Sequence, residues 1–136
     1  MLRQIDHIGI AVKNLDETVA FYRQVMGLEV SSTEVFNDMK IAFLRIGDSE
    51  LELLEDLTPD GVIARHVAKR GEGIQHMAYR VDNIEQALQD MRAKGIALID
   101  ERPRAGARKA RVAFLHPKST KGVLIELVEL PRLPPP

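Results

Sequence analysis

The chain predicts an α+β fold in which two tandem β-α-β-β-β modules form a curved mixed sheet around a central trough. The first observation is a repeat: "IDHIGIAV" at residues 5–12 returns as "IQHMAYRV" at residues 74–81, which places His7 and His76 69 positions apart (76 − 7). The second is that a helix start and a similar series of short strands follow each copy. Two open sheets of this kind would pair to cover each other's edges, which predicts the trough between them.

Each copy of the repeat leads into a helix with its own start and stop signals. Asn14 is followed three residues later by Glu17, and Asn83 three residues later by Gln86, as in a capping box. The runs "ETVAFYRQVM" and "QALQDMRAK" then predict helices that each meet a glycine, the residue that most readily takes the left-handed cap conformation. Both modules therefore place one helix directly after their first strand.

Three short strands complete each module. Alternating apolar residues between turn signals predict them at "LEVSS", "KIAFLRIG" and "ELELLE" in the first module and at "IALID", "ARVAFLHP" and "VLIELVE" in the second. The predicted layout is one domain over residues 1–136, with module one at about 1–57, a linker helix at about 58–72, module two at about 73–130 and a proline-rich tail at 131–136.

Composition narrows the functional classes. The 19 basic and 20 acidic side chains nearly balance, so the charge gives no support for binding the phosphates of nucleic acids or membranes. No apolar window is long enough to span a bilayer, and the first residues lack a signal-peptide pattern. Because cysteine is absent, disulfides and thiolate metal sites are excluded. We expect a cytoplasmic protein that binds neither nucleic acid nor membranes.

Four polar side chains recur at matching places of the two modules. Alternation along the first strand puts His7 on the face with small neighbours, opposite the bulky face that suits packing under the helix, and the same holds for His76. Glu52 in "ELELLE" is matched by Glu126 in "LIELVE", 74 positions later (126 − 52). If both sheets turn their helix-free faces inward, all four side chains converge on the trough.

Two imidazoles and two carboxylates form a ligand set for a divalent metal ion. Zinc, cobalt, manganese, iron and nickel all accept it, and its charge balances that of the ion. A lone histidine in a strand is more often structural, and a lone glutamate is more often an outward-facing acid. A core, however, does not require the same polar pair in both copies. His66, in the predicted linker helix, and His116, in a turn before Pro117, have no such counterpart.

The chain resembles the methylmalonyl-CoA epimerase family of the vicinal oxygen chelate superfamily. The likeness covers nearly the whole chain, through "IDHIGIAV", "FYRQVMGLEV", "ELELLE" and "KRGEGIQHMAYRVDNI", and is most specific at "FLHPKSTKGVLIELVE". It implies the glyoxalase fold with a metal in the trough, cobalt first or else manganese, zinc or nickel. The implied metal ligands are His7, Glu52, His76 and Glu126. The residues implied on the CoA side are Lys118, Ser119 and Lys121.

The activity that the resemblance implies is epimerisation at C2 of methylmalonyl-CoA by a homodimer acting on this acyl-CoA thioester. A metal would stabilise the enolate formed when the C2 proton leaves, and two acid/base groups are needed. Glu126 looks like one of them, as both ligand and base. Some family members carry the second as a glutamate where this chain has Ile41. In this chain the second acid/base group could be Glu50, Asp38, Lys40 or a metal-bound water.

Three alternatives stand beside this interpretation. A glyoxalase-I-type lyase would use a similar ligand set, but the segment "HPKSTKGVLIEL" favours the epimerase. A ring-cleaving dioxygenase needs two histidines and one carboxylate within a single module. A metal-free binding protein of the same architecture would not need four ligands. The loop "GARKAR" is also more basic than the glycine-rich form associated with the family. We expect this difference to affect substrate binding.

Overall fold

The computed structural model describes residues 1–132. The chain divides into two compact units, one formed by His7–His76 and one that joins Met1–Asp6 to Met77–Pro136. We call them the first and the second unit. The divisions between them fall inside the two repeated strands, beside the two repeated histidines. Residues 133–136, which belong to the predicted proline-rich tail, lie outside the described residues.

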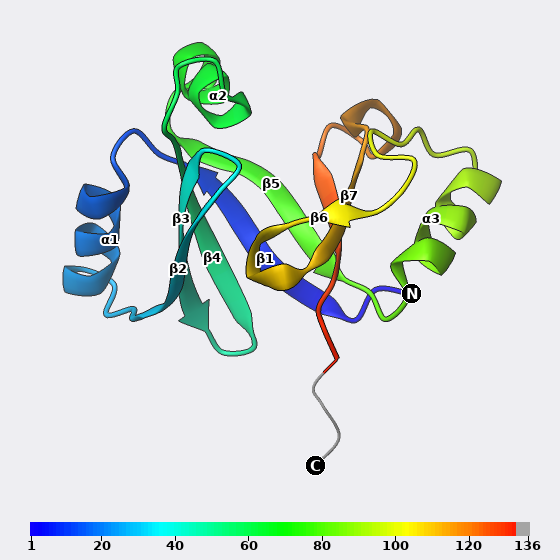
Figure 1. Ribbon diagram of the computed structural model, residues 1–136, viewed down its shortest axis with the longest axis horizontal. Helices are drawn as coiled ribbons and strands as arrows, with labels where there is room; N and C mark the ends of the chain where they lie inside the picture. The colour runs from blue at the N-terminus through cyan, green and yellow to red at the C-terminus, as the bar shows by residue number, and fades with distance from the viewer. Residues whose placement is uncertain (133–136) are drawn as a thin grey trace. The chain divides into compact units, whose positions relative to one another are not determined.

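The first unit contains most of the first module, the linker helix and the start of β5 (Gly73–Arg80), up to His76. Its elements are β1 (Gln4–Ala11) from His7 onward, α1 (Leu15–Gln24), β2 (Val30–Phe36), β3 (Met39–Ile46), β4 (Ser49–Asp56) and α2 (Val62–Arg70). The strand order is β2-β3-β4-β1, in which β4 runs parallel to β1 and antiparallel to β3. Helix α1 flanks these strands (Figure 1) over a buried cluster of Val12, Leu15, Ala42, Leu44 and Leu53.

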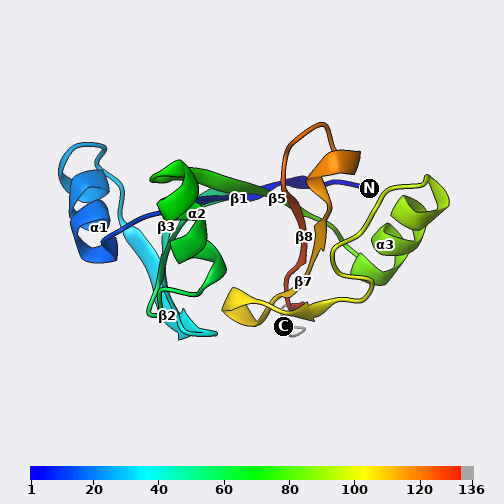
Figure 2. The same cartoon turned by 90° about the horizontal axis from the view of Figure 1, so that it is seen from above.

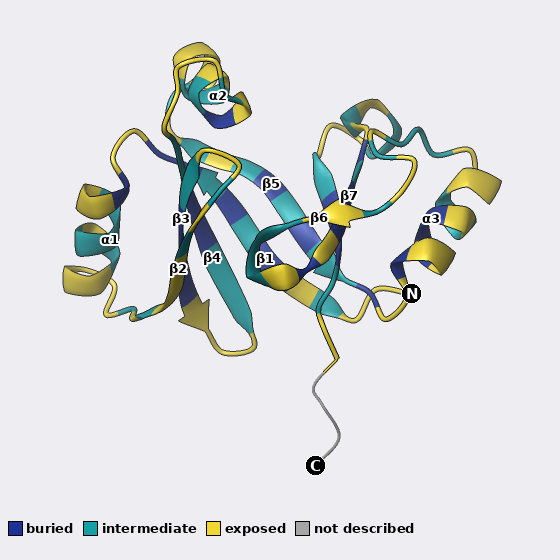
Figure 3. Cartoon of the chain, in the orientation of Figure 1, coloured by how far each residue is buried: buried dark blue, intermediate teal, exposed yellow. Residues whose placement is uncertain are grey.

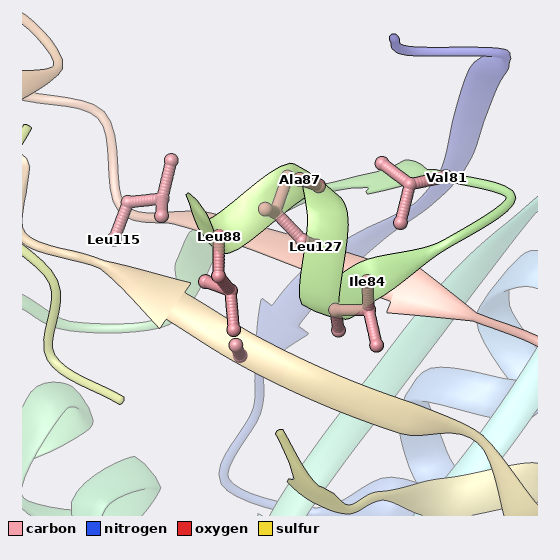
Figure 4. Close-up of a cluster of buried hydrophobic side chains, with 7 residues drawn as sticks. Val81, Ile84, Ala87, Leu88, Leu115 and Leu127 are labelled. Carbon is pink, nitrogen blue, oxygen red and sulfur yellow. The ribbon is translucent and has the colours of Figure 1, made fainter. Parts of the chain in front are cut away.

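The second unit repeats this plan. Its elements are β5 (Gly73–Arg80) from Met77 onward, α3 (Ile84–Ala93), β6 (Arg104–Ala105), η1 (Ala107–Lys109), β7 (Arg111–Leu115), η2 (Pro117–Ser119) and β8 (Ile125–Glu129). The strand order is β5-β8-β7-β6, with β8 parallel to β5 and antiparallel to β7. Helix α3 lies beside β7 and β8 (Figure 2), and Figure 4 shows the buried cluster that it covers: Val81, Ile84, Ala87, Leu88, Ala113, Leu115 and Leu127.

Both module helices start in the way that the sequence predicts. The Asn14 side chain accepts the N–H three residues later at 3.0 Å, and the Asn83 side chain does the same at 3.0 Å. A glutamate from the last strand of each module, Glu55 or Glu129, accepts the N–H of the first helical residue at 2.6 and 2.8 Å. A carboxylate at this end also favours the positive end of the helix dipole. The repeated glutamates thus tie each helix to its sheet.

One predicted strand, "IALID" at 96–100, is wrong. This segment makes an isolated bridge to β7, and the short β6 pairs with β7 instead. The N–H groups of Ile99 and Asp100 both donate to the Phe114 carbonyl, at 2.9 and 3.2 Å, and the Asp100 carboxylate accepts the Phe114 N–H at 2.8 Å. Because two donors share one carbonyl and a side chain takes the remaining N–H, the regular ladder cannot continue.

The other predicted elements are confirmed, so the chain has the α+β fold with two related modules. The predicted linker helix is α2, and the remaining strands appear near the expected places, except that β2 begins two residues after the start of "LEVSS" and continues to Phe36. Figure 3 shows that α1 and α3 each expose one side; α3 buries Ile84, Ala87 and Leu88, while α1 buries Leu15 and is otherwise partly buried or exposed. None of the helices in the described part of the chain has the length and apolar character needed to cross a membrane. The single-domain layout and the trough stay predictions.

Candidate metal centre

Three of the four predicted ligands lie together inside the first unit. The donor atoms of His7 on β1, Glu52 on β4 and His76 on β5 all lie within 4.8 Å of one another. Glu52 Oε1 lies 3.4 Å from Nε2 of each histidine, and the two Nε2 atoms lie 3.1 Å apart. All three side chains are buried, with exposed fractions of 2% for His7, 6% for Glu52 and 4% for His76. A buried cluster of this composition is the kind that holds a cation.

Strand pairing places these side chains. The parallel β1–β4 ladder sets Gly9 beside Glu52, and the antiparallel β3–β4 ladder sets Phe43 on the other side of Glu52. The His7 ring meets the Phe43 ring edge to face, with centroids 5.9 Å apart and planes at 85°. The His7 and His76 rings meet in the same way, at 5.2 Å and 89°. Packing therefore fixes the orientation of the imidazoles before any ion binds.

Gly9 provides the space that the His76 ring fills. A Cβ atom built on Gly9 would lie 2.0 Å from Cε1 of His76 and 2.3 Å from Nδ1. A glycine inside a strand often marks such a close approach, because any larger residue would occupy the same volume. The glycine thus allows the two histidines to meet in one site.

We expect Gly9→Ala to weaken divalent metal binding by roughly tenfold or more, because the added methyl group displaces an imidazole ligand. Inductively coupled plasma mass spectrometry of the purified variant and competition with a fluorescent chelator would measure the loss. The matched control is Ala78→Gly, which changes the residue at the repeat-equivalent position (9 + 69) in the opposite sense. Wild-type metal affinity in Gly9→Ala would show that His76 does not depend on this space.

The histidines keep Glu52 ionised. Burial alone would raise the pKa of Glu52, but the hydrogen bonds to His7 and His76 and the attraction of both imidazoles outweigh it and lower the pKa to about 2. The Gln75 amide oxygen lies 2.5 Å from His76 Nδ1 and, as an acceptor, assigns the proton to that nitrogen. With Nδ1 next to Gln75, Nε2 is the nitrogen of His76 that lies near Glu52 and that would bind a metal ion.

This donor set fits a divalent transition metal. Two imidazole nitrogens and one carboxylate oxygen suit zinc, cobalt, manganese, iron and nickel, and three protein ligands leave positions for other ligands. A carboxylate that stays ionised down to acidic pH is ready to bind a cation without first losing a proton.

The fourth predicted ligand, Glu126, belongs to the second unit and has the same local setting there as Glu52 has in the first. Each lies on the last strand of its module, parallel to the module's first strand and opposite an aromatic residue, Phe43 for Glu52 and Phe114 for Glu126. Glu126 is 8% exposed. The repeat therefore extends from sequence to strand register and burial, while the role of Glu126 as a ligand and base stays a prediction.

The first unit contains the three side chains that could serve as the second acid/base group: Glu50, Asp38 and Lys40. Their places in the sheet narrow this choice. Ile41 lies on β3 opposite Leu54, on the face that also carries Phe43 beside Glu52. Alternation puts Lys40 on the opposite face, with the residues that pack under α1, and Asp38 lies exposed in the β2–β3 turn. Glu50, two residues before Glu52, shares its face. Of the three side chains considered, Glu50 alone lies on the ligand-bearing face.

Glu50 also lies close to the cluster. It pairs with His7 in the β1–β4 register, and its side chain is 12% exposed. Arg45, opposite it on β3, approaches its carboxylate to 3.8 Å. The first unit thus offers a second carboxylate beside the proposed ligands.

The residues predicted on the CoA side lie around η2. Lys118 and Lys121 are exposed, and the Ser119 hydroxyl accepts the Ala97 N–H at 2.9 Å, which fixes the preceding loop. His116 caps this turn by accepting the Lys118 N–H at 3.2 Å on Nδ1. A CoA contact at these residues stays a prediction.

Other residues shape the site without having been assigned a role from the sequence. Gly9, Phe43 and Gln75 position the two histidines, and of these only Gly9 carries a sequence signal, as a glycine in a strand interior. His66 lies on α2, and burial together with the nearby Arg70 lowers its pKa.

Comparison with known proteins agrees with this arrangement. Residues 6–114 match the model of the Glyoxalase/Bleomycin resistance protein/Dioxygenase superfamily. The chain is 36% identical over 129 residues to human mitochondrial methylmalonyl-CoA epimerase, covering 93% of this chain and 73% of the relative. A variant of the Streptomyces coelicolor methylmalonyl-CoA epimerase, solved with 2-nitronate-propionyl-CoA, is 40% identical with a TM-score of 0.94 and full coverage of both chains.

A further solved structure, a methylmalonyl-CoA epimerase in complex with methylmalonyl-CoA and NH4+, gives the same identity of 40%, the same TM-score of 0.94 and 100% coverage of both chains. These matches extend over both β-α-β-β-β modules and confirm the predicted fold. The chain belongs to the methylmalonyl-CoA epimerase family of the glyoxalase/bleomycin resistance protein/dioxygenase superfamily.

Proposed function

We propose that this protein interconverts the two C2 epimers of methylmalonyl-CoA with the help of a divalent metal ion held by His7, Glu52 and His76. The observation that carries the proposal is the buried donor set, with its three donor atoms within 4.8 Å, in a chain of the epimerase family. Relatives with this name, one of them solved with methylmalonyl-CoA, support the choice of substrate.

The chain's residues divide the work in this proposal. A bound divalent ion supplies stabilisation of the negative charge that develops on substrate oxygen. Glu126 joins the ligand set and takes or returns the C2 proton on one face of the substrate. The equivalence of Glu126 with Glu52 in strand register and burial supports its place in the site. Cobalt is the expected ion, with manganese, zinc or nickel as alternatives.

Epimerisation needs a second group that handles the proton on the opposite face. We assign this role to Glu50, because Ile41 cannot carry a proton and Glu50 shares the face and strand of Glu52. In this proposal the Glu50 carboxylate takes the role of the glutamate that some family members carry at the position of Ile41. The proposed mechanism thus uses two glutamates that come from different modules of the chain.

Further features of the proposal concern binding and assembly. Lys118, Ser119 and Lys121 are proposed to face the CoA part of the substrate, where the exposed lysines suit phosphate. The protein is proposed to act as a homodimer. A cytoplasmic location stays a prediction, and the human relative is named as mitochondrial.

The test is the conversion of a single C2 epimer of methylmalonyl-CoA, followed by chromatography that separates the two epimers. We expect the metal-loaded protein to bring either epimer to the same equilibrium mixture. The hemithioacetal of methylglyoxal and glutathione, offered in parallel, tests the lyase alternative. Turnover of the hemithioacetal with no epimerisation would replace the proposal by that alternative.

A further inference from the structure

A buried carboxylate in the second unit holds two arginine side chains. Asp6, with an exposed fraction of 0%, accepts hydrogen bonds on Oδ1 from Arg80, at 3.0 Å from Nε and 2.7 Å from Nη2. Its Oδ2 accepts a hydrogen bond from Nη2 of Arg108. Two guanidinium groups therefore share one buried carboxylate. Burial strengthens the pairing because water and salt screen it less.

The backbone of Arg108 has an unusual conformation. Arg108 and Lys109 both have φ of 58°, in the left-handed region. The β2–β3 turn of the first module also has two left-handed residues, Asn37 at 49° and Asp38 at 59°, and it uses side chains that tolerate this conformation. The second module places an arginine and a lysine there instead. Of these two residues, Arg108 is the one whose side chain donates a hydrogen bond to Asp6.

The side chains of this cluster lie on the same face of the second unit as Glu126. Ala78 pairs with Glu126, and Arg80 follows Ala78 by two residues, so Arg80 and Glu126 point to the same side of the sheet. This is the side opposite α3, where Ala78 packs with Val112 and Val128. The η1 segment brings Arg108 to Arg80 through Asp6.

A third guanidinium lies near Glu126. Phe114 pairs with Glu126 on the neighbouring strand, and the Arg104 guanidinium carbon lies 5.3 Å from the centre of the Phe114 ring. The Arg104 side chain is 51% exposed. Its Nε lies 3.2 Å from Oδ1 of Asp100, so the charge of Arg104 is balanced within that pair.

We propose that Arg80 and Arg108, held by Asp6, form a binding site for an oxyanion of the acyl-CoA substrate. The proposal rests on the proposed function for the substrate, whose oxyanions are a carboxylate and the CoA phosphates. Planar guanidinium groups recognise both by paired hydrogen bonds. The bonds to Asp6 use Nε and Nη2 of Arg80 and leave its Nη1 outside this pairing. The side chains of Arg80 and Arg108 are 31% and 17% exposed, so solvent reaches both.

Calorimetric titration of the metal-loaded protein tests this site without requiring turnover. The variant is Arg108→Gly, which removes the guanidinium and relaxes the turn, and Asp6 keeps Arg80 as its partner. We expect it to bind methylmalonyl-CoA roughly tenfold more weakly or worse. The matched control is Lys109→Gly, which relaxes the same turn and should bind as the wild type does. Arg80→Gln, which leaves Arg108 on Asp6, should reproduce the loss.

Four ligands separate the sources of the oxyanion. If the site binds the carboxylate, Arg108→Gly weakens methylmalonyl-CoA and leaves propionyl-CoA unchanged. If it binds a phosphate, the variant weakens both thioesters. A larger loss for CoA than for 3′-dephospho-CoA then identifies the 3′-phosphate, and an equal loss identifies the diphosphate. Wild-type affinity of Arg108→Gly for every ligand, or an equal loss in Lys109→Gly, would overturn the proposal.

The inference and the proposed function can fail separately. A wild-type protein that binds these thioesters without epimerising them would refute the function and leave the binding site to be judged by the Arg108→Gly titration. A wild-type protein that binds none of the CoA compounds would refute the oxyanion site.

Discussion

Replacing Glu126 by glutamine should lower epimerisation by about 10²- to 10⁴-fold, the range usual for loss of a general acid or base. The amide keeps the size of the side chain and an oxygen able to bind metal, but it cannot accept the C2 proton. Epimerisation is measured on single epimers, and solvent deuterium incorporation at C2 is followed by mass spectrometry. The variant should still exchange the C2 proton of the epimer that the other carboxylate serves.

The control for this variant is Glu129→Gln on the same strand. Glu129 accepts the N–H of Ile84, and glutamine retains an acceptor there, so activity should stay near that of the wild type. Metal content is measured for both variants, which separates loss of the base from loss of the ion. Wild-type epimerisation by the metal-loaded Glu126→Gln variant would remove Glu126 from the mechanism.

Glu50→Gln should also lower the rate of epimerisation, by about 10²- to 10⁴-fold. The proton on the opposite face of the substrate then has no donor or acceptor. If the two glutamates serve opposite faces, the two variants retain exchange with opposite epimers. This complementary pattern is the signature of a two-base mechanism, because one base alone would show the same preference in both variants.

Glu55→Gln is the matched control for Glu50→Gln. Glu55 lies on the same strand and accepts the Leu15 N–H at 2.6 Å, a role that glutamine can retain. We expect near-normal epimerisation from this control. Should Glu50→Gln epimerise as fast as the control, a water molecule or another side chain must supply the second proton.

Duplication made much of the fold and the cluster of three proposed ligands predictable. The same histidine and glutamate in both copies indicate a site, and strand alternation predicts that His7, Glu52 and His76 share one face. The repeated cap residues Asn14 and Asn83 marked both helix starts correctly. These features are local, so a period of two along a strand or a capping side chain is enough to predict them.

Features that depend on tertiary contacts were not predictable in the same way. Asp6 and Arg108 are 102 residues apart, and no periodicity connects them. The segment at 96–100 has the alternation of a strand, but the Asp100 carboxylate takes the Phe114 N–H and ends the ladder. The sequence shows that Ile41 has no ionisable group and cannot act as an acid or base. The choice of Glu50 over Lys40, however, required the register of β3 against β4.

The most direct test of the account is solvent deuterium incorporation at C2 of methylmalonyl-CoA before and after removal of metal. The protein is treated with chelator, dialysed and then titrated with cobalt, while metal content is measured at each step. We expect exchange to disappear with the metal and to return in full at about one ion per chain. Undiminished exchange by protein that contains no metal would contradict the central claim that His7, Glu52 and His76 bind an ion required for the reaction.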